Sequence, residues 1–299
     1  MNALTERRYA EAERVFRMAL ELAETNSTPN KDTVVSMNNV AGVLHYTGKY
    51  VEAAAMYERA NNLAETVLGA DDDIWPNLLT NYGANSRALG RYAQSEALHR
   101  RALEIARRIT STEDTIARIE NNLGELLFSE RRYIEAEQLF LQAKTRSADA
   151  WMNLAELYFQ TGRFSESESL LREAIRQGLR PAAAWVGLGR LLRRRGKWRE
   201  AELAFTTSLQ HASDPQIRGY ALNALGAMFY NRGMYSNAAD AFRKAANEQV
   251  GRDTAALSLM NLGNALERMH LHEQAASMYQ RALIADETAL GPGSSHAGA

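Results

Sequence analysis

The chain has 299 residues, of which 45% are hydrophobic and 24% are charged, so it can bury a core and is not disordered throughout. Its 35 basic and 36 acidic side chains give a net charge of −1. This balance argues against a protein whose main task is to bind nucleic acid, because phosphate binding needs a basic surplus. The absence of Cys excludes disulfides, Cys-ligated zinc and thiol catalysis.

The N-terminal segment predicts neither export nor membrane insertion. Residues 1–8 are charged and no apolar core follows them, unlike a signal peptide. The chain has no run of about 18 apolar residues that could span a bilayer. We therefore expect a cytoplasmic protein that does not enter a membrane.

The pattern of the chain predicts helices. Four prolines lie between stretches rich in strong helix formers, and apolar residues recur at three- and four-residue spacing. No strand-like alternation persists, so we expect an all-α fold. The four prolines are Pro29, Pro76, Pro181 and Pro215.

A turn motif recurs along the chain. A small residue is followed two positions later by an aromatic residue, and then by small and large residues at fixed distances. The first copy is Gly48-Lys49-Tyr50, with Ala53, Tyr57 and Ala60. Later copies begin at Gly90, Arg131, Gly162, Gly196, Gly233 and, more weakly, His270.

A second motif, Leu-Gly or a near equivalent, lies upstream of each turn. The clearest copies are Leu123-Gly124, Leu188-Gly189, Leu225-Gly226 and Leu262-Gly263, with looser ones at Leu154-Ala155, Tyr82-Gly83 and Val40-Ala41. Together the two motifs resemble the signature of the tetratricopeptide repeat over roughly residues 1–287. The resemblance implies a right-handed α–α superhelix, in which each unit is an antiparallel pair of helices, A and B.

The motifs place the units in chain order. We expect one solenoid over residues 1–288, with a half unit at 1–26 and seven units at about 34–67, 76–110, 117–147, 148–181, 182–213, 219–250 and 256–287. Residues 289–299 are small and rich in Gly, which predicts a disordered tail. The half unit at the start and the missing polar helix at the end predict uncapped edges, covered by a partner or by homo-oligomerisation.

The spacing of the turn aromatics divides the units into two types. The first three intervals are 41, 42 and 41 residues, against about 34 for an ordinary repeat. The longer units resemble the kinesin-light-chain type of tetratricopeptide repeat, and the later ones resemble the ordinary type. The extra seven residues predict about one additional turn in each helix.

In this architecture the A helices line a concave face. Counting so that position 8 lies seven residues before the turn glycine, positions 2, 6, 9 and 13 share the stripe that faces the groove. Asn recurs at position 6, although Asn is a poor helix former. The five copies are Asn39, Asn81, Asn122, Asn153 and Asn261.

Two interpretations of this Asn ladder stay open. An Asn side chain offers a carbonyl and an amide, which match the N–H and C=O of an extended peptide. This resembles the asparagine ladder of O-linked N-acetylglucosamine transferases. Alternatively, each Asn hydrogen-bonds a neighbouring helix or another Asn and sets the stacking.

Charged and polar neighbours in the groove complete the predicted peptide-binding site. Arg190 and Arg194 favour an acidic segment or a C-terminal carboxylate, and the pair Glu125 and Glu156 favours a basic ligand. The remaining predicted contacts are Asn77, Arg87, Tyr220 and Asn264. The carboxylate clamp of chaperone-binding relatives is not supported, because Asn38 and Gly42 stand where it needs Lys and Asn.

The sequence favours no catalysis. Glu125 and Glu156 indicate an acidic patch rather than an acid–base pair, and the six His residues lack metal-ligand spacing. We expect no catalytic residue, no metal and no cofactor. The predicted function is a non-enzymatic scaffold that binds a protein or an extended peptide. The alternative is a regulatory or autoinhibitory module of a larger signalling enzyme or transcription regulator.

Overall fold

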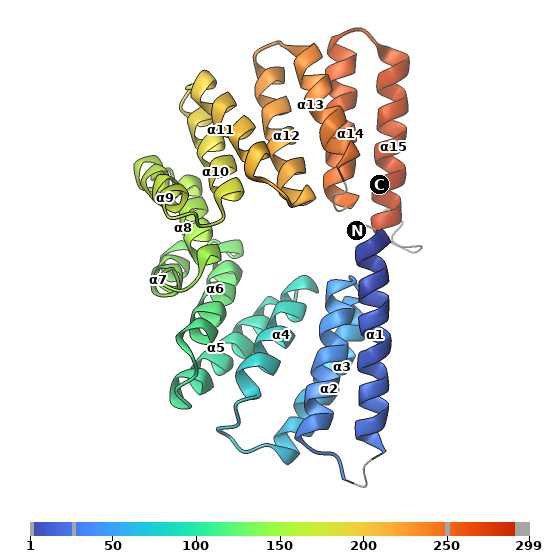
Figure 1. Ribbon diagram of the computed structural model, residues 1–299, viewed down its shortest axis with the longest axis vertical. Helices are drawn as coiled ribbons and strands as arrows, with labels where there is room; N and C mark the ends of the chain where they lie inside the picture. The colour runs from blue at the N-terminus through green and yellow to red at the C-terminus, as the bar shows by residue number, and fades with distance from the viewer. Residues whose placement is uncertain (1–2, 26–27, 249–251, 291–299) are drawn as a thin grey trace. The chain divides into compact units, whose positions relative to one another are not determined.

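The computed structural model describes residues 3–25, 28–248 and 252–290, which form fifteen α-helices and no strand (Figure 1). The all-α fold predicted from the repeats is therefore confirmed for this part of the chain. Two compact units divide within helix α8, one over residues 3–157 and one from residue 158 onward. The single solenoid expected over residues 1–288 stays a prediction.

The first unit begins with an unpaired helix and continues with helix pairs. Its helices are α1 (Ala3–Glu24), α2 (Lys31–Tyr46), α3 (Tyr50–Val67), α4 (Trp75–Ala88), α5 (Tyr92–Arg108), α6 (Glu113–Ser129), α7 (Tyr133–Ala143) and the start of α8 (Ala148–Gln160).

The second unit repeats the same hairpin. After the end of α8 it contains α9 (Phe164–Arg176), α10 (Pro181–Arg194), α11 (Trp198–His211), α12 (Pro215–Asn231), α13 (Tyr235–Asn247), α14 (Arg252–Arg268) and α15 (His272–Leu290). The predicted tail begins at residue 289, but α15 continues to Leu290. The rest of that prediction, residues 291–299, lies outside the described residues.

The even-numbered helices are the A helices, and they form the inner layer of each unit. Helices α1 to α7 each pack on the next one along the chain, as do α9 to α15, and A helices also contact the following A helix, as α2 does α4 and α4 does α6. Within the residues described, the backbones of α3 and α5 do not approach one another as closely, and neither do those of α5 and α7. The units therefore curve toward their A helices, which places a concave face on α2, α4 and α6.

The left-handed turns expected after helix A are present in all seven pairs. Five carry Gly, for example Gly48 with φ +80° and Gly196 with φ +74°. Two carry larger residues in the same conformation, Arg131 and His270, each with φ +62°. A side chain is strained there, which explains why Gly is the usual residue, but the repeat geometry imposes the turn even without it.

Glycine at position 8 allows the two helices of a pair to pack closely. A Cβ atom added to Gly124 would lie 2.6 Å from the ring of Phe140, and one added to Gly189 would lie 2.6 Å from Phe205. Gly226 and Gly263 approach Phe242 and Tyr279 in the same way. The partner lies sixteen residues later in each case, so the small residue and the ring form one interlocking contact.

The longer early units differ from the later ones in their B helices and not in their A helices. Helix α3 has 18 residues and α9 has 13, whereas α4 and α10 both have 14. The connection over residues 68–74 is also three residues longer than that over 177–180. The prediction of one additional turn in each helix is therefore wrong for these A helices.

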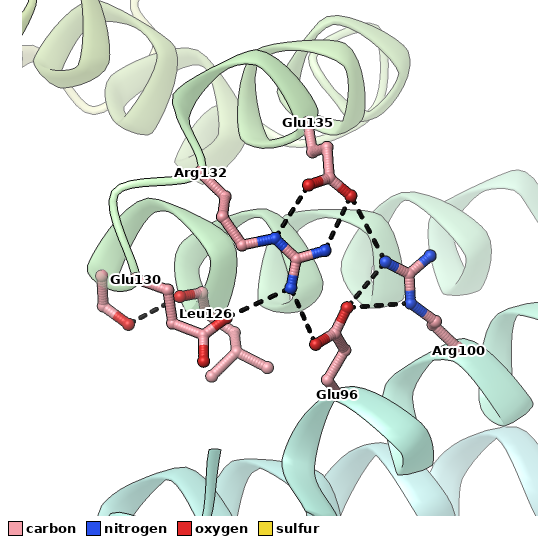
Figure 2. A network of polar contacts seen from close by, with 7 residues as sticks. Glu96, Arg100, Leu126, Glu130, Arg132 and Glu135 are labelled. Carbon is pink, nitrogen blue, oxygen red and sulfur yellow. Dashed lines mark hydrogen bonds and ion pairs between the residues drawn. The ribbon is translucent and has the colours of Figure 1, made fainter. Parts of the chain in front are cut away.

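A network of ion pairs connects consecutive helix pairs within the first unit (Figure 2). Arg132, at the turn before α7, contacts Glu96 on α5 at 2.8 Å and Glu135 on its own helix at 2.8 Å. Arg100 contacts Glu96 at 2.7 Å and Glu135 at 3.4 Å. Arg132 and then Arg100 lower the pKa of Glu96, so this carboxylate is held in its charged form.

The same connection recurs at the start of the chain. Glu13 on α1 pairs with Arg17 one turn later and with Lys49 at the turn before α3. Glu13 and Lys49 lie 36 residues apart, as do Glu96 and Arg132. A Glu on one B helix thus pairs with the basic residue that follows the next A helix.

We predict that Gly124→Ala lowers the free energy of unfolding by about 1 kcal/mol. Overpacking against the buried Phe140 ring costs about 1–3 kcal/mol, and the better helix propensity of Ala returns about 1 kcal/mol. Urea denaturation measures the difference. The control is Gly69→Ala, because no atom lies within 4 Å of the added Cβ there. Equal stability of Gly124→Ala and wild type would contradict the close contact.

We predict that Glu96→Gln lowers stability by about 1 kcal/mol at pH 7, and that this loss shrinks in acid. The folded pKa of Glu96 lies below its ordinary value of 4.5, so its stabilisation is complete above that pH and is lost as the pH falls through the folded pKa.

Urea denaturation of the variant and of wild type between pH 3 and pH 7 tests this dependence. The matched control is Glu104→Gln, since Glu104 is largely exposed and its single ion pair, with Arg108, is 3.4 Å long. A difference between Glu96→Gln and wild type that stays constant down to pH 3 would show that the ion pairs contribute nothing.

Candidate functional site

The concave face of residues 3–157 contains a pocket of about 550 Å³. Half of its lining residues come from the predicted stripe, at positions 2, 6, 9 and 13 of consecutive A helices. These lining residues are Gly42, Tyr46, Asn81, Ala84, Arg118, Asn122 and Asp149. The remaining lining residues are His45, Tyr57, Asp114, Asn121, Arg146, Ser147 and Ala148.

The five Asn residues of the ladder are all half-buried, but their surroundings differ. Asn81 Nδ2 donates to Asn38 Oδ1 at 3.2 Å, and Asn153 Nδ2 donates to Asn121 Oδ1 at 2.9 Å. Each therefore binds position 5 of the preceding A helix. These two bonds favour the stacking interpretation for Asn81 and Asn153.

Asn122 differs because it lines the pocket. Within the part of the chain that the structure describes, its side chain makes no hydrogen bond to protein. Its carbonyl and its amide therefore keep their hydrogen-bonding capacity beside the cavity. Asn39 on α2 and Asn261 on α14 are half-buried at the equivalent position.

Glu125 is the centre of a polar junction between three A helices. Its Oε1 accepts hydrogen bonds from Asn121 and Asn153, each at 3.0 Å, and its Oε2 pairs with Arg87 at 3.0 Å. Asn121 is 5% exposed, so this junction is partly shielded from water. The predicted site residues Glu125, Arg87 and Asn153 thus contact one another and join α4, α6 and α8.

Arg118 is a pocket residue that the predicted site leaves out. Arg118 is half-buried, and its guanidinium donates a hydrogen bond to Asn77 Oδ1. The predicted site residue Asn77 therefore contacts Arg118. Burial lowers the pKa of Arg118, although an arginine stays charged at neutral pH. The signal that could have identified it was its place at position 2 of the stripe.

The buried side chain of His99 is affected by the positive charges of Arg87 and Arg118. His99 is 1% exposed and lies against Gly83. Burial, together with smaller effects of the charges of Arg87 and Arg118, lowers the pKa of His99 to about 4. His99 is therefore neutral at pH 7, in a position where other pairs carry Phe or Tyr.

Aromatic side chains form the end of the pocket on α2. Tyr46 is 66% exposed and stacks on Tyr9 with ring centroids 6.2 Å apart. In the same cluster, His45 Nδ1 lies 3.1 Å from Asn85 Oδ1. Burial raises the pKa of the Tyr57 phenol, which also lines the pocket. These residues are absent from the predicted site, because the prediction rests on a repeated residue type and this cluster occurs once.

The second unit holds the predicted arginines. Arg190 lies over the Phe159 ring at 5.1 Å, and Arg194 is exposed at the end of α10. Burial lowers the pKa of the intervening Arg193, and the charges of Arg190 and Arg194 add to this. The three guanidinium groups are thus close enough to repel one another.

The remaining predicted contacts are spread over other helices. Tyr220 on α12 is 51% exposed, Asn264 accepts a hydrogen bond from Tyr279 at 2.8 Å, and Glu156 on α8 is half-buried. In the described ranges, no three His, Asp or Glu side chains gather as metal ligands. No helix among these residues is long and apolar enough to cross a membrane.

We predict that two ladder substitutions differ in their effect on stability. Asn153→Ala removes the bonds to Asn121 and to the Glu125 carboxylate, which should cost about 1–3 kcal/mol. Asn122→Ala should change stability by less than about 0.5 kcal/mol, because it removes no bond within the protein. Urea denaturation compares them, and equal losses would mean that Asn122 is also a stacking residue.

Comparisons with known proteins agree with the repeat geometry. One family model, described as a tetratricopeptide repeat, matches residues 3–66 and 76–147. A second model of the same description matches residues 143–185, 152–216 and 186–254. No curated protein sequence matches the chain.

Solved structures share the fold at low sequence identity. A tetratricopeptide repeat protein from Parabacteroides merdae ATCC 43184 has a TM-score of 0.64 at 18% identity, over 88% of this chain and 94% of its own. PilF of Pseudomonas aeruginosa has a TM-score of 0.53 at 20% identity, over 74% of this chain and 94% of its own. From the two family models and the helix pairs together, we conclude that the chain belongs to the tetratricopeptide-repeat family.

Proposed function

We propose that the chain is a non-enzymatic interaction module that binds an extended segment of a partner protein along α2, α4, α6 and the start of α8. The observation that carries this proposal is the pocket, half of whose lining residues are stripe residues from four consecutive A helices. Proteins with tetratricopeptide repeats generally mediate protein–protein interaction, which supports a protein as the partner.

The hydrogen-bonding groups suit a polypeptide backbone. The Asn122 side chain can offer the ligand two N–H donors and one carbonyl acceptor. The Asn81 amide binds Asn38, so its carbonyl oxygen is the group that can accept a hydrogen bond from the ligand. An extended segment has unpaired N–H and C=O groups that need such partners when they leave water. In this proposal Asn122 binds the ligand, whereas Asn153 holds the helices that shape the groove.

The second unit contributes a separate contact surface in this proposal. Arg190 and Arg194 would attract an acidic stretch of the partner, with Tyr220, Asn261 and Asn264 as further contacts. The mutual repulsion of three arginines on α10 favours an anion there, since an anion would relieve it. We also propose that the early repeats are of the kinesin-light-chain type, and the support for this is their 41- and 42-residue spacing.

A peptide selection tests the groove. The 299-residue protein would be screened against a displayed library of random extended peptides, and the affinity of selected peptides would be measured by fluorescence anisotropy. We expect Asn122→Ala to weaken binding about tenfold, because two hydrogen bonds to the peptide backbone are lost.

The control is Gln138→Ala, an exposed position on the B helix α7, which should leave binding unchanged. Equal affinity of Asn122→Ala and wild type for every selected peptide would overturn the concave groove as the binding site. Failure to select any peptide would overturn extended-segment binding altogether.

A further inference from the structure

We propose that α1 is a dimerisation surface, and that two copies of this chain associate by pairing their first helices in antiparallel orientation. The evidence is an apolar face of α1 that the described part of the chain leaves open, together with the charges beside it. None of the residues on this face lines the concave pocket, so the surface is separate from the proposed groove.

The two sides of α1 differ in what covers them. One side packs on α2 and buries Leu20 in the core. The opposite side carries Val15, Met18 and Leu22, which are 51%, 61% and 72% exposed. Their spacing of three and four residues places them on one stripe of the helix. A contiguous apolar stripe that faces water is typical of an interaction surface.

Met18 distinguishes α1 from the B helices that follow it. At the same position, nine residues after the aromatic residue of the repeat motif, each of the next three B helices carries a polar side chain that contacts the preceding B helix. These contacts are Arg59 with Glu24, Arg101 with Glu65 and Gln142 with Arg107. A methionine cannot make such an ion pair and offers an adaptable apolar side chain instead. The open face of α1 therefore suits an apolar helix better than the ordinary stacking of one repeat on another.

The charges beside the stripe favour a second copy of the same helix. Arg14 and Glu21 are exposed on one flank of it, and neither side chain makes an ion pair over residues 3–25, 28–248 and 252–290. A twofold axis that crosses the helix between Val15 and Met18 would place Arg14 of each copy opposite Glu21 of the other. The same axis pairs Val15 with Met18 of the other copy. The flank is thus complementary to itself in charge, and the stripe is complementary to itself in polarity.

The ends of the stripe favour the antiparallel orientation. In a parallel pair, Arg8 would face Arg8 and Glu11 would face Glu11 across the seam, which like-charge repulsion opposes. In the antiparallel pair, Glu11 lies opposite Leu22, so its methylene groups can cover that side chain while its carboxylate stays in water. The small residues Ala12 and Ala19 then meet along the other flank and allow the two helices to approach closely.

Sedimentation equilibrium of the 299-residue protein tests the association directly. A single helix pair is a small interface, so we expect a dissociation constant of about 10 µM, which a concentration range from about 1 µM to about 200 µM covers. The mass should rise from that of one chain toward that of two. A monomer over the whole range would overturn the proposal and would leave the stripe to a helix of another protein.

Met18→Arg tests the stripe. The substitution introduces the residue that α3 and α5 carry at this position, so the helix accepts it. It should weaken dimerisation about tenfold or more, because it places a charge in the apolar seam. The matched control is Ile134→Arg, since Ile134 is 78% exposed on α7 and should leave the dimer unchanged. A Met18→Arg dimer as tight as that of wild type would contradict the proposed surface.

A charge exchange tests the orientation. Arg14→Glu and Glu21→Arg each place like charges opposite one another twice in the dimer, so each variant alone should associate about tenfold more weakly than wild type. The double variant Arg14→Glu/Glu21→Arg should regain the wild-type affinity, because it restores both pairs with their signs reversed.

A mixture of the two single variants guards against misfolding. A chain with Arg14→Glu and a chain with Glu21→Arg complement each other at both places, so the mixture should form a heterodimer more tightly than either variant binds itself. If the mixture associates no better than the single variants, or if the double variant stays weak, the antiparallel pairing is wrong and the proposal fails. Asn122→Ala should leave the dimer unchanged, so the groove and this surface are tested independently.

Discussion

The contact on which the structure depends is the one between a small residue on helix A and a large ring sixteen residues later on helix B. The contact of Gly124 with Phe140 leaves no space for a side chain, since a single added carbon would lie 2.6 Å from the ring. This contact sets the distance between the two helices of a pair. Because it repeats at Gly189, Gly226 and Gly263, one local rule places the helix pairs along most of the chain.

The curvature of the first unit, and therefore its pocket, follows from this packing. The backbones of consecutive A helices approach closely, whereas those of the described B helices α3, α5 and α7 lie further apart and are linked by long side chains, as in Arg100–Glu135. The groove residues are consequently those A-helix side chains that point away from the B layer. Ion pairs such as Glu96–Arg132 then connect one B helix to the following turn (Figure 2).

The polar groups of the concave face divide into two kinds. Asn153, Glu125 and Arg87 satisfy one another and bind three helices together. Asn122 and Arg118 line the same pocket with most of their hydrogen-bonding capacity unused. This division shows why a recurring residue type need not have a recurring role: Asn122 and Asn153 share position 6, but the preceding helix offers a partner to Asn153.

The sequence by itself determined the helix pairs, their turns and the stripe that lines the groove, because these depend on residue size and spacing at short range. The turn at Arg131 and the contact of Gly124 with Phe140 follow from the repeat alone. Only the tertiary structure decided which groove residues already have partners. Glu125 is surrounded by Arg87, Asn121 and Asn153, and Arg118 lacks an acid, because side chains from different helices meet at distances that no spacing within one repeat specifies.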